Sequence, residues 1–112
     1  MAWIAYALPV LPGQADRLER WEEELAPHYD DYVALNERAT VKRHYEWLQR
    51  SPGGGLRITL FEVDDPAATN RDFEDTPYDD WWRRHVMEVH GFDPGEVGEG
   101  AFPVMIHSYE AG

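Results

Sequence analysis

Hydrophobic and polar residues follow two different periods along the chain, and each change of period marks a new element. Residues 3–10 are apolar at odd and even positions alike, which predicts a strand covered on both faces. From Gln14 the apolar residues recur every three to four positions, which predicts an amphipathic helix kinked at Pro27. The apolar stripe of this helix comprises Leu18, Trp21, Leu25, His28 or Tyr29, Tyr32 and Leu35.

Two further strands follow this helix. Residues 41–49 alternate as an extended chain does, with His44 and Glu46 on one face and Arg43, Tyr45 and Trp47 on the other. The mixed character of both faces predicts an edge strand. Residues 56–63 are again apolar at both parities, and the Gly-rich segment 51–55 predicts a loop that joins the two strands into a hairpin.

Residues 64–91 predict two helical pieces. Asp65 before Pro66, and Thr76 before Pro77, are both helix-start signals, and Gly91 ends the run. One face of the second piece is apolar and aromatic, and carries Tyr78, Trp81, Trp82, His85, Val86 and Val89. The opposite face carries Asp79, Asp80, Arg83, Arg84 and Glu88. Two interpretations stand: a core helix that covers a sheet, or the wall of an aromatic pocket with His85 as its titratable group.

Residues 102–109 complete the pattern as a last strand. The element order is then β-α-β-β-α-β, which predicts an α+β, ferredoxin-like fold with a four-stranded antiparallel sheet and both helices on one face. Two helices cover one face only, although the first and third strands are apolar on both. We therefore expect a second copy to pack sheet to sheet across a two-fold axis, as a homodimer.

Composition narrows the class of protein. The 112 residues suit one domain, residues 1–112. A net charge of -12 argues against a nucleic-acid partner. The chain has no cysteine, which fits a reducing cytosol, and its apolar start is short and lacks a basic flank, unlike a signal peptide or membrane span. We expect a cytoplasmic protein without a membrane segment.

Several local motifs carry a resemblance to a known group. They are a first strand closed by LPG, then RWEEEL, HYEWLQ, EVDDP, TPYDDWW and VMEVHG. Together they resemble an uncharacterised small family of the dimeric α/β-barrel superfamily, whose members include aromatic polyketide cyclases, cofactor-free monooxygenases of polycyclic phenols, muconolactone isomerases and stress proteins. The resemblance implies a substrate held between sheet and helices, near His44, Glu46, Tyr78, Trp82 and His85.

Two groups of residues could move a proton, with His85 as the first choice and His44, oriented by Glu46, as the second. His44 and Glu46 lie two apart on a strand, so the carboxylate could orient the imidazole as a general base; the alternative is a solvent-facing polar pair. His85 lies on the aromatic helix face, where burial would lower its pKa and keep it neutral; the alternative is a core histidine with satisfied hydrogen bonds. The candidate substrate-binding residues are Tyr6, Trp47, Tyr78, Trp81, Trp82 and His107.

The spacing of the remaining groups argues against other chemistries. No histidine pair has metal-ligand spacing on a helix turn, the glycines at 53–55 precede a strand instead of a phosphate-binding helix, and no serine sits in a nucleophile elbow. We therefore expect an enzyme without metal or organic cofactor. It would bind a hydrophobic, aromatic or polyketide-like molecule and assist proton transfer in a cyclisation or isomerisation. A cofactor-free monooxygenase and a non-enzymatic binding or structural dimer are the alternatives.

Overall fold

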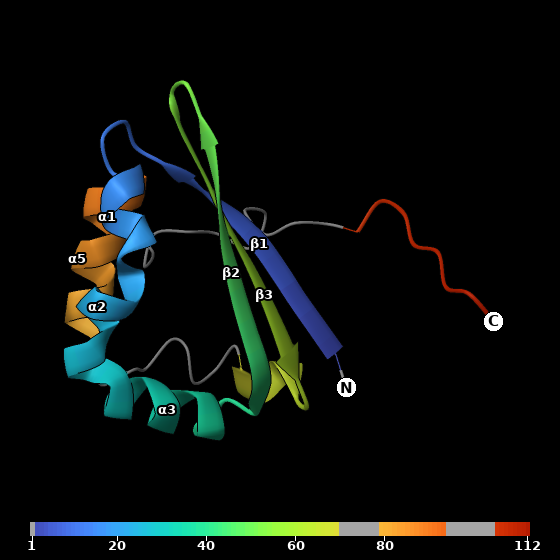
Figure 1. Cartoon of the computed structure of the whole chain (residues 1–112). Helices are drawn as coiled ribbons and strands as arrows, with labels where there is room; N and C mark the ends of the chain where they lie inside the picture. Colours follow the sequence, from blue (N-terminus) through green and yellow to red (C-terminus); the bar gives the residue numbers. More distant parts are fainter. Residues whose placement is uncertain (1, 70–78, 94–104) are drawn as a thin grey trace.

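A three-stranded antiparallel sheet with helices packed on one face forms the fold (Figure 1). The computed structural model describes residues 2–69, 79–93 and 105–112. Its elements, in chain order, are β1 (Ala2–Val10), α1 (Ala15–Glu19), α2 (Trp21–Leu25), the 3-10 helix η1 (Ala26–His28), α3 (Tyr29–Arg38), β2 (Val41–Ser51), β3 (Gly54–Val63) and α5 (Asp79–His90). Residues 66–69 are also helical, and the Asp65 carboxylate accepts a hydrogen bond from the Ala67 amide, as the predicted N-cap requires.

The expected four-stranded ferredoxin-like sheet, and with it the dimeric α/β-barrel fold, is wrong. In the described part of the chain the sheet has three strands in the order β1-β3-β2. Residues 105–112 have no regular structure and run away from the sheet (Figure 1), and Met105 and Ile106 are 80% and 96% exposed. Alternating apolar residues suit a pleated surface, but they do not specify a neighbouring strand with which to pair. Residues 102–104 of the expected strand lie outside the described residues.

The first helical region is confirmed as an amphipathic layer, although it is more broken than the pattern predicts. Leu18, Leu25 and Leu35 are buried, as the stripe requires. The break at Pro27 is confirmed as the 3-10 helix η1. A second break, at Arg20 between α1 and α2, was not predicted, because Arg20 itself favours a helix.

The hairpin between β2 and β3 is tighter than the Gly-rich segment predicts. Ser51 pairs with Gly54, which leaves only Pro52 and Gly53 in the turn. Gly55 belongs to β3 with φ +139, and a Cβ there would lie 2.3 Å from the Gln49 carbonyl oxygen. Glycine is therefore required inside this strand by the close approach of its neighbour.

A β-bulge decides which side chains of β2 face the helices. Val41 pairs with Val63 and Arg43 pairs with Glu62, so Lys42 is an extra residue on β2. Side chains alternate along a strand, and one inserted residue therefore exchanges the two faces beyond it. Beyond the bulge, His44 lies opposite Phe61 and faces the helical layer.

Candidate functional site

The helix-facing side of the sheet holds a cluster of polar and aromatic side chains, arranged in cross-strand rows. Each row takes one residue from β1, β3 and β2: Ile4–Phe61–His44, then Tyr6–Thr59–Glu46, then Leu8–Arg57–Leu48. Neighbouring rows lie two residues apart and so share one face. The register thus places His44, Glu46 and Arg57 within reach of one another, between the sheet and the helices.

His44 joins a hydroxyl to a carboxylate. Its Nε2 lies 3.1 Å from Glu46 Oε1, and its Nδ1 lies 2.7 Å from the Tyr32 hydroxyl of α3. The ring stacks on Phe61 with 4.1 Å between centroids, and the His44 side chain remains 14% exposed. The prediction that His44 and Glu46 share a face and interact is confirmed, whereas Tyr32 appeared in the sequence only as a member of a helical stripe.

The shifted pKa values of Glu46 and Tyr32 indicate which side chains around His44 donate and which accept hydrogen bonds. Burial alone would raise the pKa of Glu46, but hydrogen bonds and charges from His44 and Arg57 outweigh it and lower the pKa to about 2. Glu46 is therefore an acceptor only, and His44 Nε2 must donate to it. Burial raises the pKa of Tyr32, so its hydroxyl keeps its proton. In the tautomer with hydrogen on Nε2, Nδ1 is the acceptor and the Tyr32 hydroxyl donates to it.

Arg57 is the centre of the cluster, and the sequence reasoning missed it. It is 1% exposed, and its guanidinium carbon lies 4.6 Å from the Trp21 ring and 5.2 Å from the Trp82 ring. Its Nη2 donates to Glu46 Oε2 at 2.8 Å. A single arginine within the apolar run LRITLFEV, at a position of the buried parity, was the signal that could have found it.

Two buried histidines of α5 complete the cluster. Arg57 Nη1 lies 2.9 Å from His85 Nε2 and 3.4 Å from His90 Nε2. The opposite ring nitrogens face acceptors: His85 Nδ1 lies 3.3 Å from Glu24 Oε1, and His90 Nδ1 lies 2.7 Å from the Pro9 carbonyl oxygen. Burial, and then the charge of Arg57, lowers the pKa of both histidines to about 4, which confirms the expected neutral form of His85.

His85 thus belongs to the cluster, but both of its ring nitrogens are engaged. It is 1% exposed, and a substrate could reach its Nε2 only if Arg57 moved away. Glu24, the partner of His85 Nδ1, is itself bound by Arg17 at 2.6 Å, and Arg17 also binds Glu88 at 2.7 Å. This link joins α1, α2 and α5 above the sheet.

The tryptophans form a stack between the two helical segments. Trp21 lies 5.5 Å from Trp81 and 4.5 Å from His85, while Trp82 stacks on His85 at 5.5 Å. His28 covers the outer side of Trp81 at 4.1 Å. In these contacts Trp81 and Trp82 pack against protein rings, as the core interpretation of α5 requires.

The other candidate substrate-binding residues are dispersed. Tyr6 lies in the cluster, where burial raises its pKa to about 12. Trp47 lies on the opposite face of the sheet and is 51% exposed. His107 lies in the exposed C-terminal segment, and Tyr78 lies outside the described residues.

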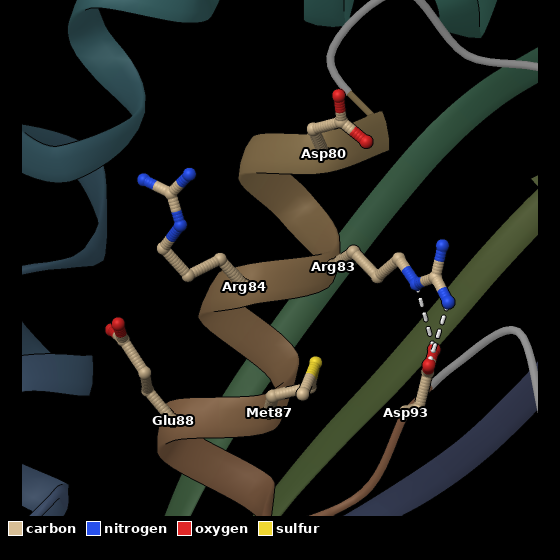
Figure 2. A pocket seen from close by; sticks show the side chains of 6 residues that line it. All are labelled: Asp80, Arg83, Arg84, Met87, Glu88 and Asp93. Carbon is tan, nitrogen blue, oxygen red and sulfur yellow. Dashed lines mark hydrogen bonds and ion pairs between the residues drawn. The ribbon is translucent and has the colours of Figure 1, made fainter.

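An open hollow of about 660 Å³ lies on the outer face of α5, away from the cluster. Figure 2 shows its lining, which consists of Asp80, Arg83, Arg84, Met87, Glu88 and Asp93. Arg83 binds both carboxylate oxygens of Asp93, at 2.8 and 2.6 Å. Among residues 2–69, 79–93 and 105–112, no three or more histidine and carboxylate side chains are grouped to hold a metal ion.

Comparison of the chain with protein-family models, with curated proteins and with solved structures finds no match. The resemblance to the dimeric α/β-barrel superfamily therefore stays a prediction about ancestry and activity. Within the described residues, no helix is long and apolar enough to cross a membrane.

Proposed function

We propose that the protein is a cofactor-independent enzyme that moves a proton on a hydrophobic, aromatic or polyketide-like molecule, during cyclisation or isomerisation. His44 is the proton acceptor in this proposal, Glu46 orients it, and the Tyr32 hydroxyl meets the substrate. The observation that carries the proposal is the continuous Tyr32–His44–Glu46 hydrogen bonding at a site that is only part-buried.

The proton moves in two coupled transfers. The substrate gives a phenolic or activated-methylene proton to the Tyr32 oxygen, while the Tyr32 proton passes to His44 Nδ1. The resulting imidazolium lies beside the Glu46 carboxylate, whose charge stabilises it. The substrate is left as a phenolate or enolate, which either recovers the proton at another atom or attacks its own carbonyl group to close a ring.

The surroundings suit an aromatic substrate. Phe61 stacks on His44, and Tyr29, which is 55% exposed, packs beside Tyr32 with 5.9 Å between centroids. Tyr29 offers an exposed aromatic face beside the polar group, while the buried Phe61 holds the His44 ring in place. Offset stacking on an exposed aromatic face favours planar ligands.

The test compares proton exchange on one probe, a naphthol that carries a β-diketone side chain. We expect His44→Gln to slow exchange at the activated methylene by about 10²- to 10⁴-fold, the usual contribution of a positioned base. Tyr32→Phe should slow it as well, whereas Tyr45→Phe, which removes the same hydroxyl from the opposite sheet face, should not. NMR of deuterium loss measures the rate, and parental rates in both site variants would overturn the proposal.

We also propose a homodimer through the face of the sheet that none of the described helices covers. Trp3, Tyr45 and Trp47 are 55%, 46% and 51% exposed on this face. Covering half of three aromatic side chains would remove roughly 300 Å² from water, a substantial part of the ~800 Å² that one partner buries in a standard interface.

The shape of this face supports a second copy as the partner. Tyr45 and Trp47 form a ridge along β2, while Ala5 and Ala7 form a flat strip along β1, on the other side of β3. A two-fold axis parallel to β3 would place the ridge of one copy on the strip of the other, twice. The face is then complementary to itself.

A further inference from the structure

One guanidinium contacts two histidines, His85 and His90, directly and a third, His44, through Glu46. We infer that Arg57 is a positioning residue that determines which ring nitrogen carries the proton in His44, His85 and His90. The catalytic consequence rests on the proposed function, because His44 is the proton acceptor there. The assignment of the protons itself does not depend on any substrate.

His85 and His90 are held in one tautomer by direct contact. A guanidinium can only donate, so the Nε2 atoms that face Arg57 Nη1 must be unprotonated acceptors. On the other side of each ring, the Glu24 carboxylate and the Pro9 carbonyl can only accept, so both Nδ1 atoms carry hydrogen. Nη1 has two hydrogens, one for each imidazole.

His44 is held in the opposite tautomer through Glu46. Arg57 Nη2 binds Glu46 Oε2, which turns Oε1 toward His44 Nε2, and the Thr59 hydroxyl lies 3.4 Å from the same Oε1. The Nε2 of His44 therefore carries the hydrogen, and its Nδ1 faces Tyr32 as the basic atom.

The arrangement separates one usable base from two blocked ones. In His85 and His90 the lone pair points at a cation, whereas in His44 it points at a hydroxyl. The Trp21 and Trp82 rings, tilted at 64° to each other, both contact the guanidinium and restrict its position. Arg57 Nε is buried without a hydrogen-bond partner among the described residues, so all of the hydrogen bonds given for the guanidinium are made by Nη1 and Nη2.

The experiment uses the full chain labelled with ¹⁵N in histidine. Two-bond ¹H–¹⁵N correlation spectra near neutral pH distinguish protonated from bare ring nitrogens. We expect His85 and His90 to show hydrogen on Nδ1, and His44 to show it on Nε2. If the parent protein shows hydrogen on Nε2 of His85 and His90, the inference is overturned without any variant.

The variants then assign the effect to Arg57. Removing the arginine alone would strand the Glu46 carboxylate, so Arg57→Met is combined with Glu46→Gln. Glu24 and Pro9 still accept from Nδ1 in this double variant, but Nε2 no longer faces a cation. We therefore expect His85 and His90 to lose the spectra of a bare Nε2 near pH 6, and Arg57→Lys, which keeps a cationic donor, to retain them at least in part. Arg50→Met is the matched control, since Arg50 contacts the surface carboxylates Asp16 and Glu19. Unchanged spectra in the double variant would overturn the inference.

The outcome is separable from the fate of the proposed function. If the tautomers are as expected but His44→Gln exchanges protons at the parental rate, the proposed enzymatic function is overturned. Arg57 is then a positioning residue with a structural role only. If His85 and His90 carry hydrogen on Nε2 but His44→Gln slows proton exchange, the role of Arg57 is overturned and the proposed enzymatic function stands.

Discussion

Two buried histidines make the fold sensitive to acid. His85 and His90 have pKa values of about 4 in the folded chain against 6.5 for the free side chain. The charged groups that face them are Arg57 from β3, Glu24 from α2, Arg17 from α1 and Glu46 from β2. Because the folded pKa is lowered, the unfolded chain binds more protons, so stability is complete above pH 6.5 and declines toward pH 4.

We therefore expect the free energy of unfolding to fall by on the order of 3 kcal/mol per histidine over that window. Urea denaturation at several pH values measures the change. His85→Gln should show a shallower decline, because one of the two groups no longer titrates. A stability that stays level from neutral pH to pH 5 would show that these histidines are not held neutral.

Trp21 contacts three rings of the cluster, those of Trp81, Trp82 and His85. It also touches the Arg57 guanidinium. We expect Trp21→Ala to cost about 3 to 5 kcal/mol, as large aromatic truncations in cores do. Met87→Ala, on the exposed face of α5, should cost less than ~0.5 kcal/mol. Thermal melting compares the two, and a parental melting temperature for Trp21→Ala would contradict the packing.

At the scale of elements, the hydrophobic pattern predicted four strands, of which β1, β2 and β3 are confirmed, as are the hairpin and the buried face of α5. It wrongly predicted a strand at residues 105–109. Strand propensity reflects how one segment fits a pleated surface, but a strand forms only where a second segment pairs with it. The role of Arg57 was not predicted for a similar reason, because it depends on contacts with Trp21 and Trp82, which lie on helices distant in the sequence. The His44–Glu46 contact was predictable, since it depends only on strand geometry.

The hairpin offers a paired test of backbone geometry. Gly55→Ala would force a Cβ to within 2.3 Å of the Gln49 oxygen at a φ of +139, whereas Gly53 has nothing within 4 Å. We expect Gly55→Ala to destabilise by more than ~1 kcal/mol, and Gly53→Ala to change stability by clearly less. Equal melting temperatures of the two variants would show that β3 can move away from β2.

For the whole molecule, the proposed dimer makes a directional prediction. Trp47 and Ala7 flank Ile58 in one row, so the two-fold axis would bring Trp47 of one copy over Ala7 of the other. We expect Ala7→Glu and Trp47→Lys each to give monomers in sedimentation, because each buries an unpaired charge. An equimolar mixture of the two should regain a dimer through one Glu–Lys pair and one native contact.

The control mixture combines Ala7→Glu with Trp3→Lys, both on β1. It should stay monomeric, because the proposed axis brings β1 over β2. Recovery in the control mixture alone would indicate a different axis, and a parent protein that is monomeric at micromolar concentration would remove the dimer.

In the proposed enzyme and dimer, the two faces of strand β2 serve proton transfer and self-association respectively. His44 and Glu46 face the cluster, while Tyr45 and Trp47 face the open side of the sheet. We therefore expect substitutions at neighbouring positions of β2 to affect different properties of the protein. A saturation library over residues 43–48, scored once for proton exchange and once for self-association, should give two tolerance profiles of period two that are one residue out of phase. Profiles that coincide would mean that both properties depend on the strand as a unit.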